Sequence, residues 1–243
     1  MPIEALRAFS KKQVPPHQLV QALVAHDGWY VPMLWAMMVL RHSSFEDVVG
    51  EHRGSMGFET LRAFTSREAV TEVGEDGCYV GPIRGSELFE KLPVLLQMIE
   101  VNPGLDSAWT TRERSSLECV QEIAKGMALA HAIDRWAPGV RERLLSHVFW
   151  MYRSDTRAIP VYSRELPFGV VFTDRYSATV VADELAGWKL VRVDGSTLFA
   201  AVDALRVPGF VVNPWGHDGV NRVVPREMCQ ELAVLAETRD QVG

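Results

Sequence analysis

The sequence predicts an α/β (α+β) protein made of two tandem related modules, each a small mixed sheet flanked by helices. Three observations support this fold class: the length of the chain, an internal repeat, and the alternation of strand-like and helix-like segments within each repeat. The 243 residues suit two domains of about 100 to 120 residues each. A hydrophobic content of 47% and a charged content of 23% are typical of a globular protein.

The internal repeat consists of four pairs of similar segments that recur in one order, about 110 residues apart. The pairs are "LRAFTSREAV" (61–70) with "VVFTDRYSATVV" (170–181), "IRGSELFEKL" (83–92) with "VDGSTLFAAVDAL" (193–205), "LLQMIEVNPG" (95–104) with "VPGFVVNPWG" (207–216), and "CVQEIAKGM" (119–127) with "CQELAVLAE" (229–237). Four collinear matches indicate a duplication. They predict a first module over residues 1–136, with N-terminal helices and an insertion near 40–57, and a second over 137–243.

Each module is expected to open with a helix just after a proline, because proline suits the first helical turn. That helix follows Pro15-Pro16 in the first copy and Pro138-Gly139 in the second. An extended segment with an internal proline comes next, and here "WYVPMLW" (29–35) is matched with "RAIPVYS" (157–163). Proline cannot donate to a strand ladder, so this segment is expected at a strand start or a sheet edge.

The rest of each module alternates between strands and helices. A strand ends at Phe-Thr, and Ser66 or Asp174 is expected to cap the short helix that follows. A second strand leads to a helix that begins at Gly-Ser, with the serine as its N-cap. A third strand ends at Asn-Pro and precedes a closing helix, at 115–136 in the first copy and 225–237 in the second.

This order of segments resembles the SseB N-terminal domain family, which consists of small bacterial α/β modules. The resemblance is carried by "VVFTDRYSATVV", "VDGSTLFAAVDAL" and "FVVNPWGHDGVNRVVPREM", and it covers Ile159 to about Leu235. The first copy matches at Phe64-Thr65, at 86–89 and at 101–104, and departs from the pattern by its insertion. The resemblance implies a binding or secretion-associated module without an active site.

Charge and composition exclude several classes of protein. The net charge of -6 argues against a nucleic-acid-binding domain and fits a partner with a basic surface. The most apolar run, "WYVPMLWAMMVL" (29–40), is shorter than the roughly 20 residues that a membrane span needs. Three separated cysteines, Cys78, Cys119 and Cys229, predict buried thiols in a reducing compartment. The N-terminus lacks the apolar core of a secretory signal, and a cytoplasmic location is expected.

The stretch "FVVNPWGHDG" (210–219) places His217 beside Asp218 after a strand-like run, as a catalytic loop would. Its counterpart in the first copy, "NPGLDS", keeps Asn-Pro and lacks the histidine. The recurring feature is therefore a turn at the strand exit, in which the asparagine bonds its own backbone and proline restricts φ. The alternative is a hydrolase that uses His217, Asp218 and Glu227 as an acid–base set.

The insertion "RHSSFEDVVGEH" (41–52) holds potential ligands in His42 and His52 and carboxylates between them. Their spacing matches neither HExxH nor an EF-hand, so neither a metal nor a cofactor is expected. Insertions on a scaffold often carry function, and a residue present in only one copy is not explained by the shared fold. The residues expected to bind a partner are Glu46, Asp47, Glu51, Trp109, Trp215, His217 and Asp218.

These observations favour a non-enzymatic protein-binding protein. The first hypothesis is a cytoplasmic immunity protein that neutralises a cognate toxic effector with a basic surface, such as a nuclease of a type VI secretion system. It rests on the acidic surplus and on the secretion association of the family. The alternative is a secretion-system chaperone or regulatory adaptor. Neither nucleic acid nor a membrane is expected as a partner.

Overall fold

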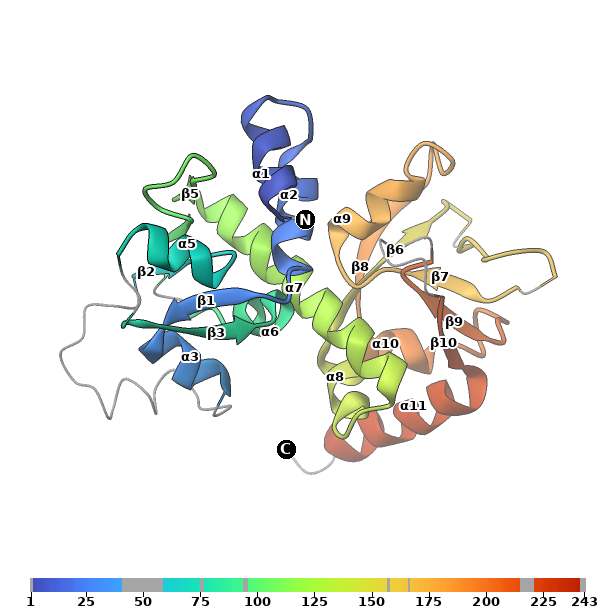
Figure 1. Ribbon diagram of the computed structural model, residues 1–243. Coiled ribbons are helices and arrows are strands. Elements are labelled where there is room, and N and C mark those ends of the chain that lie inside the picture. Colours follow the sequence, from blue (N-terminus) through green and yellow to red (C-terminus); the bar gives the residue numbers. More distant parts are fainter. Residues whose placement is uncertain are drawn as a thin grey trace. The chain divides into compact units, whose positions relative to one another are not determined.

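The structure is a computed structural model that describes residues 2–40, 59–74, 77–93, 96–156, 158–165, 167–214 and 221–240. The chain forms two compact units, Met1–Lys125 and Gly126–Gly243, each built from helices and small sheets (Figure 1). The predicted α/β fold is confirmed. The boundary between the units falls inside the helix α7 (Arg114–Arg135), whereas the repeat placed it after residue 136.

The first unit begins with helices and then alternates between strands and helices. Its elements are α1 (Pro2–Ser10), α2 (Pro16–Val24), β1 (Trp29–Pro32), α3 (Met33–Leu40), β2 (Thr60–Ala63), α5 (Arg67–Glu72), β3 (Tyr79–Ile83), α6 (Gly85–Glu90), β4 (Met98–Val101), β5 (Trp109–Thr111) and the first half of α7. The helix expected after Pro15-Pro16 is α2.

The second unit begins with the other half of α7 and follows the same order. Its further elements are α8 (Val140–Ser146), β6 (Val148–Arg153), β7 (Gly169–Val171), α9 (Arg175–Ala178), the short 3₁₀ helix η2 (Thr179–Val181), β8 (Lys189–Asp194), α10 (Gly195–Ala200), β9 (Gly209–Val212), β10 (Arg222–Pro225) and α11 (Arg226–Asp240). The helix expected after Pro138-Gly139 is α8.

Strand pairing is the same in both units. In the first, β2 runs parallel to β4, β4 antiparallel to β5, and β1 antiparallel to β3. An isolated bridge between Tyr30 and Phe64 joins β1 to the residue after β2. In the second, β7 is parallel to β9, β9 antiparallel to β10, β6 antiparallel to β8, and a Trp150–Phe172 bridge joins the two sheets. A duplicated module requires such a common order, and the duplication itself stays a prediction.

Two details of the predicted repeat are wrong. The counterpart of β1 is β6, because each of them pairs with the strand that precedes the Gly-Ser helix; residues 157–163 are not its counterpart. In that stretch Val161 makes only an isolated bridge to Gly169. The edge strands β5 and β10, which complete the three-stranded sheets, have no counterpart in the predicted element order.

The helices at Gly-Ser also begin differently from the expectation. Both α6 and α10 begin at the glycine, and the serine is not the N-cap. The glycines lie against the ends of α2 and α8, where a Cβ on Gly85 would come within 2.5 Å of the Val24 carbonyl oxygen. Instead, the Gly85 N–H donates to the His26 carbonyl (2.7 Å) and the Gly195 N–H to the His147 carbonyl (2.9 Å). Backbone contact between two helices replaces the side-chain cap.

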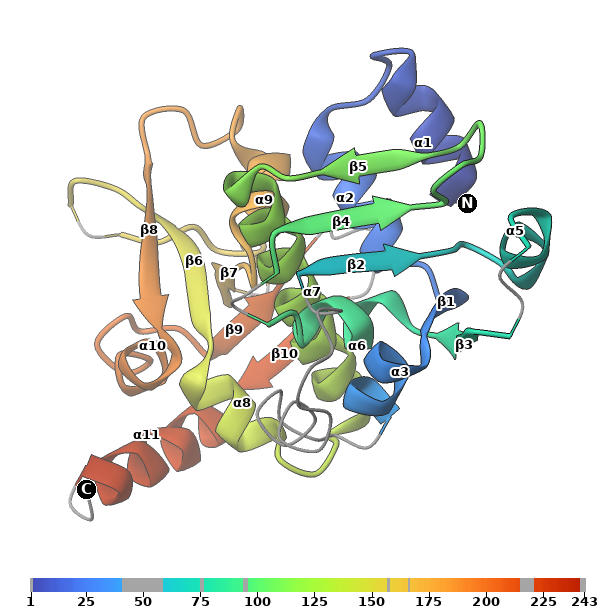
Figure 2. The same cartoon turned by 90° about the vertical axis from the view of Figure 1, so that its left-hand side faces the viewer.

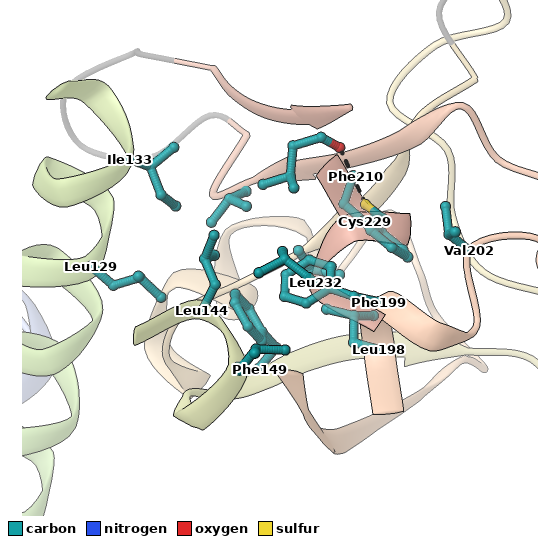
Figure 3. Close-up of a cluster of buried hydrophobic side chains, with 14 of the residues drawn as sticks. Leu129, Ile133, Leu144, Phe149, Leu198, Phe199, Val202, Phe210, Cys229 and Leu232 are labelled. Atoms are coloured by element: carbon teal, nitrogen blue, oxygen red, sulfur yellow. Dashed lines mark hydrogen bonds between the residues drawn. The ribbon is translucent and has the colours of Figure 1, made fainter. Parts of the chain in front are cut away.

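The core of the second unit lies between its sheets and the helices α7, α8, α10 and α11 (Figure 3). Phe199 is central to it, with its ring edge-to-face against Phe149 (5.8 Å) and Phe210 (6.1 Å). In the first unit, Trp29 contacts Phe89 in the same geometry (5.5 Å). The repeat predicts that Phe64, Phe89, Phe172 and Phe199 are buried, and all four are at most 1% exposed.

An ion pair between a buried arginine and a partly exposed aspartate attaches the second half of α7 to the sheet of the second unit. The Arg222 side chain on β10 is 3% exposed and donates to the Asp134 carboxylate (2.7 Å) and to the Ala130 carbonyl (3.0 Å). Both acceptors lie on α7. A buried charge needs such partners, so β10 and α7 constrain each other.

In the part of the chain that the structure describes, no helix combines the length and the apolar character that crossing a membrane requires.

The close approach at Gly195 predicts a large effect of a small substitution. Gly195→Ala places a methyl group against the backbone of Leu144, which cannot move aside as a side chain can. We expect a loss of about 3 kcal/mol in the free energy of unfolding, measured by urea denaturation. Gly77→Ala, where an added Cβ has no neighbour within 4 Å, is the matched control and should change stability by less than about 0.5 kcal/mol. Equal effects would contradict the close approach.

Candidate partner-binding surfaces

Trp109 is the only predicted partner-binding residue that the structure describes. Glu46, Asp47, Glu51, Trp215, His217 and Asp218 lie outside the described residues, as do His42 and His52. Trp109 begins β5, pairs with Val101 and is half-buried. Glu227, the third residue of the hydrolase alternative, is exposed in the first turn of α11.

In the first unit, Asn102 forms the turn by which the chain leaves β4, the strand parallel to β2. This residue follows β4 with a left-handed φ of 47°, which asparagine tolerates better than most residues. Its N–H donates to the Ala63 carbonyl on β2 (2.9 Å), and its side-chain Oδ1 then accepts from the Thr65 N–H (2.9 Å). Its Nδ2 donates to Thr65 Oγ1 (3.0 Å). The side chain thus continues the parallel ladder after the backbone has turned away.

The second unit repeats this arrangement at Asn213, whose φ is 51°. The Asn213 N–H donates to the Val171 carbonyl (2.9 Å), Oδ1 accepts from the Thr173 N–H (2.8 Å), and Nδ2 donates to Thr173 Oγ1 (2.7 Å). The expectation that the asparagine bonds its own backbone is wrong, because its partner is a threonine that follows the end of the neighbouring strand. We call these two sets, Asn102 with Thr65 and Asn213 with Thr173, the Asn–Thr crosslinks.

A histidine completes each Asn–Thr crosslink. His26 Nε2 lies 2.9 Å from the Thr65 carbonyl oxygen, and His147 Nε2 lies 2.7 Å from that of Thr173. Because a carbonyl oxygen only accepts, each imidazole carries a proton on Nε2. Sequence reasoning missed these histidines, and the available signal was their position just before the aromatic strand residues Trp29 and Phe149.

Polar side chains beside the crosslinks cap the short helices. Ser66 accepts from the Ala69 N–H at the start of α5 (3.2 Å), and Asp174 accepts from the Ser177 N–H at the start of α9 (2.8 Å), as predicted. Asp174 is 2% exposed and also accepts from Ser177 Oγ (2.6 Å). In many α/β enzymes the carboxyl ends of parallel strands hold the ligand. Here the His, Thr and Asn groups of that edge bind backbone or one another.

Histidine, cysteine and carboxylate side chains do not gather into a group of three that could hold a metal ion anywhere in the described ranges.

A groove of about 770 Å³ opens in the first unit at the amino-terminal ends of β2 and β4. Its walls come from the loop between α6 and β4, from the segment after β5, and from the first turns of α7. The apolar lining residues are Leu92, Pro93, Leu96, Met98 and Leu117, and the charged ones are Glu59, Arg112, Arg114 and Glu118. Trp109 lies at the other end of β5 and does not line the groove.

The charged side chains at the rim of the groove are exposed and partly paired. Arg114 donates to Glu118 one helical turn away (2.9 Å), with the two side chains 83% and 65% exposed. Arg112 Nε lies 3.0 Å from the sulfur of Met98. Exposed pairs of this kind contribute little to stability, so they are free to exchange for a partner's charges.

The second unit ties the corresponding segments together. Val202 is the counterpart of Leu92. The residue after it, Asp203, accepts hydrogen bonds from the Arg226 and Gln230 side chains of α11. The Arg226 hydrogen bond holds the pKa of the Asp203 carboxyl below its usual range. In the first unit, Gln121 Nε2 on α7 donates to the Leu92 carbonyl (3.2 Å). This segment is therefore held by charge in one unit and borders a groove in the other.

The cysteines differ in exposure. Cys119 and Cys229 are buried, as predicted, whereas Cys78 is exposed, which corrects the expectation for that residue. Burial raises the pKa of the Cys229 thiol to about 12, and its Sγ lies 3.6 Å from the Val224 carbonyl (Figure 3). A thiol with this pKa stays protonated at neutral pH and is a poor nucleophile.

No protein-family model matches the chain, and neither does any curated protein.

The Asn213 crosslink can be tested by substitution. Asn213→Ala removes the partner of the buried Thr173 N–H. It also places alanine, which tolerates a left-handed φ less well than asparagine, at this position. We expect the free energy of unfolding to fall by about 3 kcal/mol in urea. Asn221→Ala, an exposed asparagine that donates to the Tyr162 hydroxyl, is the control and should cost less than about 0.5 kcal/mol. A mild effect at Asn213 would refute the crosslink.

Thiol exposure gives an independent check. In the native protein at pH 8, a chromogenic disulfide reagent should titrate one thiol rapidly, and Cys78→Ser should abolish that phase. Cys119 and Cys229 should react only after denaturation, because burial keeps the thiols from the reagent. Rapid reaction of two or more native thiols would contradict the packing of α7 or α11.

Proposed function

We propose that this chain is a non-enzymatic protein-binding protein that acts as an immunity protein against a cognate secreted toxic effector with a basic surface. The observation that carries the proposal is the groove of the first unit, an apolar floor within a charged rim, in the unit that holds most of the acidic surplus. The polar groups at the carboxyl ends of the parallel strands support it as well, since they are used in the Asn–Thr crosslinks.

The distribution of charge favours the first unit as the contact surface. Residues 1–125 contain 12 Lys and Arg against 17 Asp and Glu, whereas residues 126–243 contain 13 against 14. Nearly the whole net charge of -6 therefore belongs to the first unit. A basic effector surface would be attracted to this unit before contact, and such steering raises association rates.

The anatomy of the groove suits protein recognition. Interfaces combine an apolar centre with a polar rim, and the strongest contacts are anchors seated in a pocket. Leu96 is 8% and Leu92 7% exposed, so the floor is preformed. Glu59 and Glu118 supply acidic groups at the rim, where they can pair with basic side chains of an effector.

The resemblance to the SseB N-terminal domain family supports a connection with secretion, and it also fits a chaperone or adaptor. An immunity protein and a chaperone differ in what binding does to the effector. Co-expression with the protein encoded beside this chain in the genome separates them: an immunity protein abolishes the growth defect, whereas a chaperone binds and leaves the toxicity intact. Absence of binding to that protein would refute both.

The rim carboxylates lead to a kinetic prediction. Glu59→Lys combined with Glu118→Lys should slow association with that effector at least fivefold at low salt and flatten its salt dependence, because rim charges act mainly on the encounter. Stopped-flow fluorescence at two salt concentrations measures both quantities. The control is the same charge change at two exposed positions of the second unit, Glu184→Lys with Glu237→Lys. Equal slowing by the two double variants would exclude the groove as the contact surface.

A further inference from the structure

The outer strands of the two units differ in how they are protected against pairing. The edge strands are β3 and β5 in the first unit and β8 and β10 in the second. Strands β5 and β10 have 3 and 4 residues, and β10 ends at Pro225. Strand β3 contains Pro82, which lacks an N–H, and its pairing with β1 is shifted between Trp29 and Val31. Short length, proline, irregular register and charged side chains are the usual means of blocking an edge.

Strand β8 is neither short nor interrupted by proline or by a register shift, and it carries charged side chains instead. It pairs with β6 over 6 residues in unbroken register, from Val148 opposite Asp194 to Arg153 opposite Lys189. Within the described ranges, its other side has no strand partner, and it lies at the outer side of β6 in Figure 2. A regular edge of this length offers a row of backbone donors and acceptors to an added strand.

The side chains of β8 specify what kind of strand fits. Val191 and Val193 pack against the core of the second unit and are only half-buried, so the apolar surface continues to the edge. Arg192, between them, is exposed, and its guanidinium lies over the Trp150 ring (5.7 Å from the ring centre). A strand directly opposite would complete the apolar row beside the valines and meet a fixed positive charge at the position between them.

From this geometry we infer that the edge of β8 binds an extended segment of a partner protein, apolar at alternate positions and acidic opposite Arg192, by adding it as a strand. Lys189 already pairs with Asp155 (2.8 Å), so the charges that make the edge selective are Arg192 and Asp194. An added strand without complementary charges leaves these two side chains unpaired. This surface is separate from the groove of the first unit and does not rest on the proposed function.

The test uses the full chain and capped octapeptides of alternating valine and glutamate or of alternating valine and lysine. Calorimetry at low salt should show the glutamate peptide binding at least tenfold more tightly than the lysine peptide. Hydrogen–deuterium exchange should slow at residues 189–194 when the glutamate peptide is bound. A glutamate peptide N-methylated at alternate residues should not bind, because it cannot complete the backbone ladder.

Charge reversal provides the decisive variant. Arg192→Glu should invert the preference, so that the lysine peptide binds at least tenfold more tightly than the glutamate peptide. Arg164→Glu, the same change at an exposed residue between β6 and β7, should keep the original preference. Thermal melting confirms that both variants fold.

Four outcomes would overturn the inference. They are no binding of either peptide at millimolar concentration, binding without slowed exchange in β8, binding that tolerates N-methylation, and a preference that Arg192→Glu leaves unchanged.

Discussion

The Asn–Thr crosslink is the constraint on which each unit depends. Two parallel strands of 3 or 4 residues make few ladder hydrogen bonds, and the chain must leave both at the same edge. Asn102 and Asn213 solve this problem by turning the backbone into the left-handed region while their side chains carry the ladder one step further. The carbonyl of the threonine held in this way then accepts a hydrogen bond from the histidine that precedes the neighbouring antiparallel strand. Three segments of each unit thus meet at one buried point.

The crosslinks also bear on function. Histidine, threonine, asparagine and aspartate at the carboxyl ends of parallel strands resemble an active site when read as residue types. In this protein their hydrogen-bonding groups are directed to backbone atoms and to one another, and Asn102, Thr65 and Thr173 are at most 5% exposed. A group already engaged in a buried network has to break it before it can transfer a proton to a substrate. The arrangement is therefore better suited to holding the fold than to chemistry.

The surfaces proposed for recognition lie where the two units differ. The shared strand order and the shared crosslinks account for the residues common to both. The groove beside Leu92 lies in the first unit, and Asp203 ties the corresponding segment of the second unit. The regular edge of β8 lies in the second unit, and Pro82 interrupts the corresponding strand β3 of the first unit. Two units with the same strand order can differ in their exposed segments at little cost in stability, and these are the segments that a partner meets.

The sequence by itself determined the local features. Prolines before α2 and α8, the caps at Ser66 and Asp174, the strand exits at Asn-Pro and the buried phenylalanines all follow from preferences that act over a few residues, and the structure has each of them. The four matched pairs of segments fall on elements that follow the same order in both units, whereas residues 157–163 do not correspond to β1. Of the predicted partner-binding residues, only Trp109 lies in the described part of the chain.

Only the tertiary structure decided what depends on distant partners. Gly85 begins α6 because the end of α2 occupies the place of a Cβ, and Asn213 bonds Thr173, 40 residues earlier, rather than its own turn. The ion pair between the buried Arg222 and Asp134 spans 88 residues. Even the assignment of β6 as the counterpart of β1 required its pairing with β8. Residue preferences describe a segment in isolation, whereas these contacts exist only once burial has made an unpaired N–H, carbonyl or charge too costly to leave without a partner.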